Sequence, residues 1–304
     1  MELDKSKITI IIPTLNEEEG IGRVIDEVRS YGYHNIIVVD GRSTDKTVEI
    51  AKSKGAKVIF QDGWGKAKAI STALKHVKTP FALIMDGDYT YPARYIDKIY
   101  TKLLKGYDEV IGARKWGDES QKPLFRAGNK LLTNFFNLLM GTDLSDVLSG
   151  MYAIRIESVN DALFETKGFS IESEIAAHKA SMSRRITEVP IEYRKRLGEK
   201  KLKVRHGLLI ALDMLRLSWR YNPAFTIFAI GAVLLIPGLL LGAWVAYQYF
   251  FFGVKHAFKG ILAVLLTLAG FQSLMMALIA IYVKRIELRL NRRILDILEK
   301  LGTR

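Results

Sequence analysis

The stretch "FALIMDGDYTYP" at residues 81–92 joins an apolar run directly to two aspartates. Residues 81–85 predict a buried β-strand, and Pro92 indicates that the chain has left it. Asp86 and Asp88 then stand one residue apart at the carboxyl end of that strand. Two neighbouring carboxylates repel each other unless a positive charge lies between them. The stretch therefore predicts a sheet strand that ends at a site for a positively charged group.

Short β-rich runs alternate with helical patterns up to about residue 115. This alternation predicts an α/β fold, a mostly parallel sheet with helices on both faces. Ligands of such sheets bind at the carboxyl ends of the strands, where Asp40 and Asp86 both stand. The expected strands are residues 8–12, 35–39, 57–60, 81–85 and 108–112, and the expected helices are residues 18–31, 44–54, 66–75 and 93–104.

Two long runs without a charged residue lie at residues 225–252 and 261–283. Each exceeds the roughly 20 apolar residues that a helix needs to cross a bilayer. We therefore predict a hairpin of two transmembrane helices in the cell membrane. Several basic residues flank the outer ends of the hairpin, whereas the connector carries only Lys255 and Lys259. This asymmetry predicts that both termini are cytoplasmic.

Two further segments, residues 124–140 and 204–222, have the pattern of amphipathic helices. Such helices either lie in the membrane interface or pack on the sheet. The first segment leaves both alternatives open. For the second segment, which adjoins the first apolar run, we favour the interface, with basic residues toward anionic lipid headgroups.

The chain of 304 residues is basic, with 45 Lys and Arg against 32 Asp and Glu and a net charge of +13. This balance favours anionic partners such as nucleic acid, anionic lipid or a phosphorylated substrate. Nucleic acid is not expected, because no recognised binding module occurs and aromatic residues do not alternate with the basic ones. The absence of cysteine excludes disulfides and thiolate metal sites.

The Asp86-Gly87-Asp88 motif is the sharpest chemical signal. Carboxylate oxygens at a strand end suit Mg²⁺ or Mn²⁺, and Gly87 would let a substrate approach the backbone closely. A D-x-D motif also commonly caps a turn, so the motif alone leaves both interpretations open. The same holds for "PTLNEEEG" (13–20) and "VVDGRSTDKT" (38–47), whose polar residues can cap the helices that follow.

Together these motifs resemble those of the inverting nucleotide-sugar glycosyltransferases with the GT-A fold, glycosyltransferase family 2. The likeness is greatest to the polyprenyl-phosphate branch, which includes dolichol-phosphate mannose synthase, and it covers roughly residues 7–203. It rests on stretches in the family's order: "TIIIPTLNEEEGI" (9–21), "IIVVDGRSTDKT" (36–47), "GWGKAKAI" (63–70), "LIMDGDYTYP" (83–92), "VIGARKW" (110–116), "DVLSGMYAIR" (146–155) and "ITEVPIEYRKRLGEKKL" (186–202).

The resemblance implies a role for each matching residue. Asp86, Asp88 and Arg114 would be catalytic, and the two aspartates would hold Mg²⁺ or Mn²⁺, with Asp88 the more direct ligand. Glu172 matches the glutamate of the family's F-Q-V-E motif. The nucleotide-sugar donor would contact Pro13, Leu15, Glu17, Asp40, Lys66, Asp86 and Gly87, and the acceptor phosphate or the leaving group would meet Arg114, Arg126, Ser149, Arg194, Arg196 and Lys201.

Three positions depart from the family's pattern. Gly41 stands where a second aspartate is common, and Ser170 replaces the glutamine near Glu172. Thr90 stands where a glutamine commonly follows the D-x-D motif, so Thr90 or water would replace that side chain at the metal. All three positions fall near the donor, which leaves the identity of the sugar open.

The implied reaction transfers one sugar to dolichyl or another polyprenyl phosphate at the cytoplasmic membrane face, with inversion at the anomeric carbon. GDP-mannose is narrowly favoured as donor over UDP-glucose and UDP-N-acetylglucosamine. A processive polysaccharide synthase and a catalytically silent nucleotide-sugar-binding protein are the alternatives, and an oligomer stays open. The predicted division is a transferase domain at 1–203, a juxtamembrane helix at 204–222, the hairpin at 223–284 and a basic cytoplasmic helix at 285–304.

Overall fold

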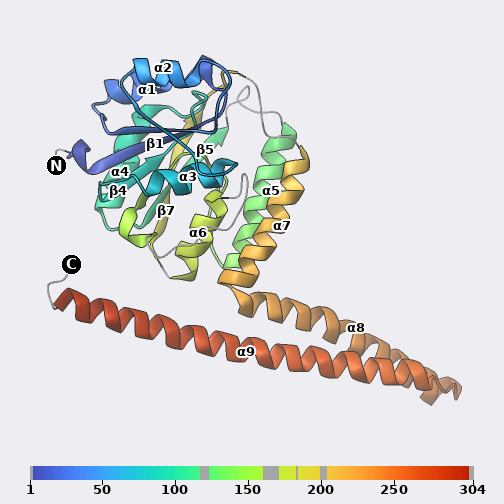
Figure 1. The fold of residues 1–304 in the computed structure, drawn as a ribbon. Coiled ribbons are helices and arrows are strands. Elements are labelled where there is room, and N and C mark those ends of the chain that lie inside the picture. Colours follow the sequence, from blue (N-terminus) through green and yellow to red (C-terminus); the bar gives the residue numbers. More distant parts are fainter. Residues whose placement is uncertain (1–2, 117–122, 160–170, 183, 199–203, 301–304) are drawn as a thin grey trace. The chain divides into compact units, whose positions relative to one another are not determined.

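The computed structural model describes residues 3–116, 123–159, 171–182, 184–198 and 204–300 (Figure 1). In this part of the chain seven strands form one sheet in the order β3-β2-β1-β4-β6-β5-β7. Strands β1 to β4 are parallel, as are β5 and β7, whereas β6 is antiparallel to β4 and β5. The mostly parallel sheet is thus confirmed. The strands are β1 (Ile8–Thr14), β2 (Ile36–Asp40), β3 (Lys57–Phe60), β4 (Phe81–Ile84), β5 (Glu109–Trp116), β6 (Tyr152–Arg155) and β7 (Ile186–Tyr193).

Helices cover both faces of the sheet. Successive strand residues point to opposite sides, so apolar strands need a layer of helices on each face. Ile10 and Ile12 of β1 belong to one buried cluster together with Ile21 of α1, whereas Ile11 packs in a second cluster with Ile70 of α3. The helices of this part are α1 (Glu18–Ser30), α2 (Thr47–Ser53), α3 (Lys66–Leu74), α4 (Ile96–Leu104), α5 (Pro123–Met140), α6 (Ile171–Ser181) and α7 (Val204–Tyr221), with 3₁₀ turns η1 (Lys5–Lys7), η2 (Ala93–Tyr95) and η3 (Ile156–Ser158).

Every strand and helix expected between residues 8 and 112 is present, and the largest shift is at β5, which continues to Trp116. Strands β6 and β7 were not among the expected strands. Strand β7 contains Pro190 and lies at the edge of the sheet, where a residue without a backbone N–H is tolerated. Its mixture of polar and apolar residues gave no clear strand pattern, yet it pairs with β5 along its whole length.

Helices α5 and α7 each bury one apolar face and leave another exposed. The exposed leucines of α5 recur every seven residues, which places them on one side of the helix. Buried side chains are Phe136 and Leu139 of α5 and Ile210 and Met214 of α7, and exposed ones are Leu124, Leu131 and Leu138 of α5 and Leu208, Leu212 and Leu215 of α7.

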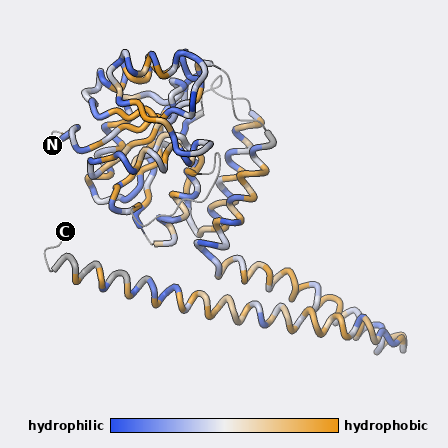
Figure 2. The backbone as a smooth tube through the Cα atoms, viewed as in Figure 1, coloured by the Kyte–Doolittle hydropathy of each residue, from blue (hydrophilic) through white to orange (hydrophobic). Residues whose placement is uncertain are grey.

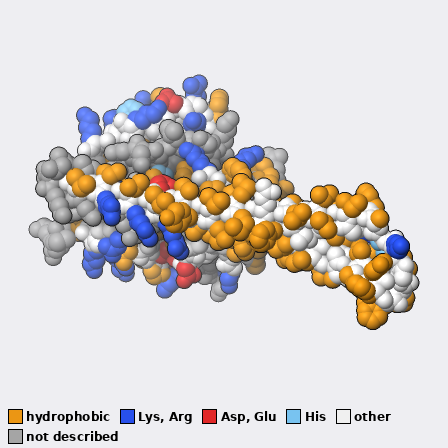
Figure 3. All heavy atoms as spheres, turned by 90° about the horizontal axis from the view of Figure 1, so that it is seen from below, with side chains coloured by type: hydrophobic (Ala, Val, Ile, Leu, Met, Phe, Trp, Pro, Cys, Tyr) orange, Lys and Arg blue, Asp and Glu red, His pale blue; other side chains and the backbone are white. Residues whose placement is uncertain are grey.

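The chain divides into two compact units, Met1–Leu217 and Ser218–Arg304. The second unit contains α8 (Pro223–Phe252) and α9 (Ala257–Lys300). Residues Pro223–Phe252 and Ala257–Glu287 form helices long and apolar enough to cross a membrane. Their apolar character is evident along both helices in Figure 2, and Figure 3 shows hydrophobic side chains over their surface.

Small residues bring α8 and α9 into close contact. A Cβ atom at Gly238 would lie 2.7 Å from the backbone nitrogen of Thr267, and one at Gly270 would lie 2.5 Å from that of Leu235. The Ser273 hydroxyl also donates a hydrogen bond to the Ile227 carbonyl at 2.8 Å. Close approach at small residues and side-chain hydrogen bonds are the usual means by which helices associate in lipid. The two apolar helices therefore form a packed hairpin.

Candidate active site

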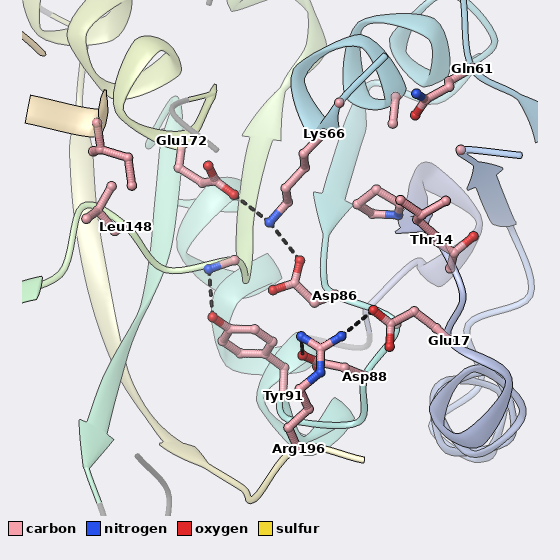
Figure 4. Close-up of a pocket in the computed structure, with 18 of the residues that line it drawn as sticks. Thr14, Glu17, Gln61, Lys66, Asp86, Asp88, Tyr91, Leu148, Glu172 and Arg196 are labelled. Atoms are coloured by element: carbon pink, nitrogen blue, oxygen red, sulfur yellow. Dashed lines mark hydrogen bonds and ion pairs between the residues drawn. The ribbon is translucent and has the colours of Figure 1, made fainter. Parts of the chain in front are cut away.

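A cavity of about 330 Å³ opens at the carboxyl ends of the strands (Figure 4). The ends of β1, β2, β3 and β4 each contribute to it, as the position of ligand sites in parallel sheets predicts. Helices α5 and α7 also reach it. The lining residues are Pro13, Thr14, Leu15, Glu17, Gly41, Gln61, Trp64, Gly65, Lys66, Ala69, Asp86, Gly87, Asp88, Tyr91, Arg114, Asn129, Leu148, Gly150, Glu172, Tyr193, Arg196 and Ile210.

Lys66, in the first turn of α3, lies between Asp86 and Glu172 (Figure 4). Its Nζ atom is 2.7 Å from the Asp86 carboxylate and 2.6 Å from the Glu172 carboxylate. Burial lowers the pKa of Lys66, but the charges of Asp86 and Glu172 outweigh burial and raise that pKa above its ordinary value. Lys66 is therefore a cation at neutral pH. It places a positive charge beside Asp86, between this aspartate and Glu172.

Asp88 is more enclosed than Asp86, with side-chain exposures of 5% and 29%. The amide and the hydroxyl of Thr90 donate to its Oδ1 atom at 3.1 and 2.5 Å. Its Oδ2 atom lies 3.0 Å from the guanidinium of Arg196, which also pairs with Glu17. Burial raises the pKa of Asp88, the charge of Asp86 raises it further, and Arg196 opposes both effects. Thr90 is fully buried and orients Asp88.

The segment after β7 carries Arg196 to this position. The backbone N–H of Arg194 donates to the Thr90 carbonyl at 2.9 Å, and that of Leu197 donates to the Asp88 carbonyl at 3.1 Å. These bonds fix the basic segment, residues 194–197, along the loop that holds the aspartates. The side chain of Arg194 instead makes a double hydrogen bond with Glu27 of α1, at 2.7 and 2.9 Å.

Arg114 on β5 is held by Asp146. Its Nε and one terminal nitrogen donate to the two Asp146 oxygens at 2.6 and 2.7 Å, and the Asp146 carboxylate also accepts the Arg114 backbone N–H at 3.1 Å. Both side chains are buried, with 7% and 6% exposure. Such a two-pronged pair fixes the orientation of a guanidinium. The pair therefore presents Arg114 at the cavity wall in one defined position.

The structure brings most of the predicted site residues together but not all of them. Asp40 is fully buried and accepts hydrogen bonds from Thr14 and Ser43, so its carboxylate holds the β1 and β2 ends in place. Ser149 donates to the Gly112 carbonyl at 2.5 Å. The cavity wall includes Pro13, Leu15, Glu17, Lys66, Asp86, Gly87, Asp88, Arg114, Glu172 and Arg196; it does not include Asp40, Arg126, Ser149 or Arg194, and Lys201 and Ser170 lie outside the described residues.

Several lining residues were not predicted. Gln61 directly follows the strand at residues 57–60, so the rule that singled out Asp40 would have found it. Trp64 lies in the loop after this strand. Asn129 and Ile210 come from α5 and α7, and no local pattern distinguishes them from neighbouring helix positions.

In the described part of the chain, the mixed sheet and the aspartate pair inside its cavity define a glycosyltransferase with the GT-A fold. The chain belongs to glycosyl transferase family 2, which it matches over residues 9–164. The protein is therefore an enzyme that transfers glycosyl groups.

Curated relatives agree with this assignment, and a solved structure shares the fold. The chain is 34% identical to Glycosyltransferase AglJ of Haloferax volcanii over 90% of its own length and 92% of that protein. It is 36% identical to a dolichyl-phosphate hexose transferase of the same organism, over 64% and 86% of the two chains. Glucosyl-3-phosphoglycerate synthase from Mycobacterium tuberculosis, solved with Mn²⁺ and uridine diphosphate, shares the fold with a TM-score of 0.59 at 20% identity, over 71% and 78%.

Gly150 provides a first test of the site. Its N–H donates to the Tyr91 hydroxyl at 2.7 Å, and a Cβ atom at Gly150 would lie 2.2 Å from an Asp86 carboxylate oxygen. We expect Gly150→Ala to turn Asp86 out of place and to lower transfer activity about 100-fold, the typical effect of a misplacement of about 1 Å. A glycosyl-transfer assay measures this loss.

The matched control is Gly128→Ala on α5, where an added Cβ atom would meet nothing within 4 Å. This variant should retain wild-type activity. Full activity in Gly150→Ala would show that the position of Asp86 does not limit the reaction.

Proposed function

We propose that the protein transfers a single sugar from a nucleotide-sugar donor to dolichyl or another polyprenyl phosphate at the cytoplasmic membrane face. One observation carries the proposal: a single cavity gathers two aspartates with Lys66, Arg114 and Arg196, on a chain that also has two helices long enough to span a membrane. The names of two relatives, dolichyl-phosphate hexose transferase and dolichol-phosphate mannosyltransferase from Pyrococcus furiosus, support the acceptor class.

The reaction is a single displacement at the anomeric carbon. A phosphate oxygen of the acceptor forms the new bond to that carbon, while the bond to the donor's diphosphate breaks and the nucleoside diphosphate leaves with the electron pair. Attack from the side opposite the leaving group inverts the configuration. A phosphate monoester has a second pKa of about 6, so it is already ionised at neutral pH and requires no general base.

Three cationic side chains of the cavity suit a reaction between two anions. Lys66, Arg114 and Arg196 each already pair with at least one carboxylate. Fixed cations near a leaving group stabilise the charge that develops as the bond breaks. An arginine in a fixed orientation also binds phosphate through two hydrogen bonds, which suits Arg114 to hold a second anion beside the first.

The aspartates fit a hard divalent cation. Both carboxylates line the cavity, and an ion held there would complete its ligands with substrate phosphate oxygens and waters. Asp86 and Asp88 would hold Mg²⁺ or Mn²⁺, with Asp86 the more accessible of the two carboxylates. The bound ion would neutralise charge on the leaving diphosphate.

The route of the acceptor is proposed to pass α5 and α7. Asn129 of α5 and Ile210 of α7 line the cavity, while leucines on other faces of both helices are exposed. An exposed apolar face beside basic residues is typical of helices that lie in a membrane interface. This arrangement would place the phosphate of a membrane lipid at the cavity. The transferase domain would then comprise residues 1–203, and both termini would lie in the cytoplasm.

The test is transfer from labelled GDP-mannose, UDP-glucose or UDP-N-acetylglucosamine to dolichyl phosphate by the full chain in lipid vesicles. We expect a lipid-extractable product carrying one sugar from one donor, GDP-mannose being favoured, and its loss when EDTA removes the divalent cation. Several sugars per lipid would indicate a processive synthase instead. Nucleotide binding without any product would indicate a silent binding protein.

A further inference from the structure

Trp64 is exposed in a place where a large apolar side chain costs free energy. Its side chain is 75% exposed, more than Leu15, Tyr31 or Phe60, the other exposed large apolar residues of the segment 3–116. Unlike Phe60, Trp64 lines the cavity. An exposed aromatic residue at the edge of a cavity is typical of a ligand contact.

The loop that carries Trp64 is shaped by glycines and tied back to the domain. Gly63 and Gly65 flank Trp64 and both have positive φ angles, +90° and +89°, which side chains rarely allow. The Asp62 N–H donates to the Thr72 hydroxyl of α3 at 2.9 Å, which ties the loop to this helix. The loop therefore holds Trp64 in a defined position while leaving most of its surface in solvent.

Arg42 supports the indole ring from the neighbouring strand end. Its guanidinium lies 6.0 Å from the ring centroid, within the range of a cation–π contact. Arg42 has a positive φ angle of +67°. In the described chain two other non-glycine residues, Asn16 and Tyr89, also have positive φ angles, and all three residues follow strands that end at the cavity. Backbone strain of this kind tends to be kept at functional sites.

The sheet order places Trp64 away from the aspartates. The aspartates follow β4, whereas Trp64 follows β3, on the far side of β1 and β2. These two strand ends are three strand spacings apart, roughly 14 Å. A donor with its diphosphate at the aspartates and its sugar toward Arg114 on β5 would extend its nucleoside toward β3. The group that reaches Trp64 is then the aromatic base.

We infer that Trp64 stacks on the nucleobase of the donor and is a specificity-determining residue of this enzyme, an inference that rests on the proposed use of a nucleotide sugar. Asp40, the polar residue expected to meet the donor, is fully buried and satisfied by Thr14 and Ser43. Gly41 carries no side chain in this region. Trp64 is the one aromatic side chain that the described cavity wall offers the base at the ends of β1, β2 and β3.

The experiment titrates the full chain in nanodiscs with UDP, GDP and inorganic pyrophosphate in the presence of Mg²⁺, by calorimetry. Trp64→Ala should weaken the better-bound nucleotide about 5- to 100-fold, the range of stacking one base on an aromatic side chain, and leave pyrophosphate binding unchanged. Trp64→Phe should stay within about threefold of wild type, because it keeps an aromatic face. Phe60→Ala, an exposed aromatic outside the cavity, is the matched control and should bind as wild type does.

Two results would overturn the inference alone. Wild-type nucleotide binding in Trp64→Ala would place the base elsewhere, and an equal loss of pyrophosphate and nucleotide would show that Trp64 acts only by positioning the loop before Lys66. A wild-type chain that binds neither UDP nor GDP would overturn the proposed function, and the inference with it.

Discussion

Asp88→Asn should reduce sugar transfer about 1,000-fold or more while the protein stays folded. Asparagine keeps an oxygen that can accept the Thr90 hydrogen bonds, but it removes the negative charge that faces Arg196 and that would hold a divalent cation. Loss of a preorganised electrostatic contact typically costs 100- to 1,000-fold in rate, and loss of a metal ligand adds to this. The rate of product formation with saturating donor, compared with wild type, measures the effect.

The matched control is Asp62→Asn, since Asp62 is an exposed aspartate outside the cavity that pairs only at 3.5 Å with Lys75 among the described residues. It should retain wild-type activity. Substantial transfer by Asp88→Asn under the same conditions would refute the role of Asp88 in binding the cation.

The stability of Asp88→Asn should equal or exceed that of wild type. The pKa of Asp88 in the folded state is raised above its ordinary value by burial and by Asp86. Between the ordinary pKa and the raised one, the carboxyl group keeps its proton in the folded chain but loses it in the unfolded chain. The free energy of unfolding therefore falls as the pH rises through this range. A neutral asparagine avoids this loss. A thermal midpoint at neutral pH well below that of wild type would contradict this expectation.

The strand-end rule explains both the successes and the failures of the sequence-based prediction. Runs such as residues 8–12 and 81–85 are uniformly apolar, so they identify buried strands, and parallel strands bring their carboxyl ends together. The rule cannot say which way a polar side chain turns once the strand has ended. Asp86 faces the cavity, whereas Asp40 turns back to accept bonds from Ser43.

Spacing within the basic segment was equally ambiguous. Arg194 and Arg196 are two residues apart in the sequence, yet one pairs with Glu27 and the other with Asp88. The backbone hydrogen bonds between this segment and the loop at Thr90 determine which of the two arginines reaches the cavity. Asp146 was not singled out because its partner Arg114 lies 32 residues away in the sequence, and no local pattern connects them.

Asp146→Ala should destabilise the folded chain by about 3–5 kcal/mol, because it leaves the buried guanidinium of Arg114 without its carboxylate. In a domain of about 200 residues this corresponds to a fall in the thermal midpoint of roughly 6–20 °C. The variant should also lose activity, since Arg114 lines the cavity and Asp146 fixes its orientation. A thermal melt of the full chain in detergent, followed by circular dichroism, measures the stability change.

Two further variants separate the ion pair from the fold. Asp143→Ala, at an exposed position three residues earlier, should melt within about 1 °C of wild type. The double variant Arg114→Met with Asp146→Leu replaces the pair by apolar side chains and should recover most of the stability, because exchanging a buried pair for packed apolar groups is often neutral. It should nevertheless stay inactive, since no guanidinium remains to meet a phosphate. Wild-type activity in the double variant would exclude Arg114 from the reaction, whereas a melt of Asp146→Ala equal to wild type would show that Arg114 finds another partner.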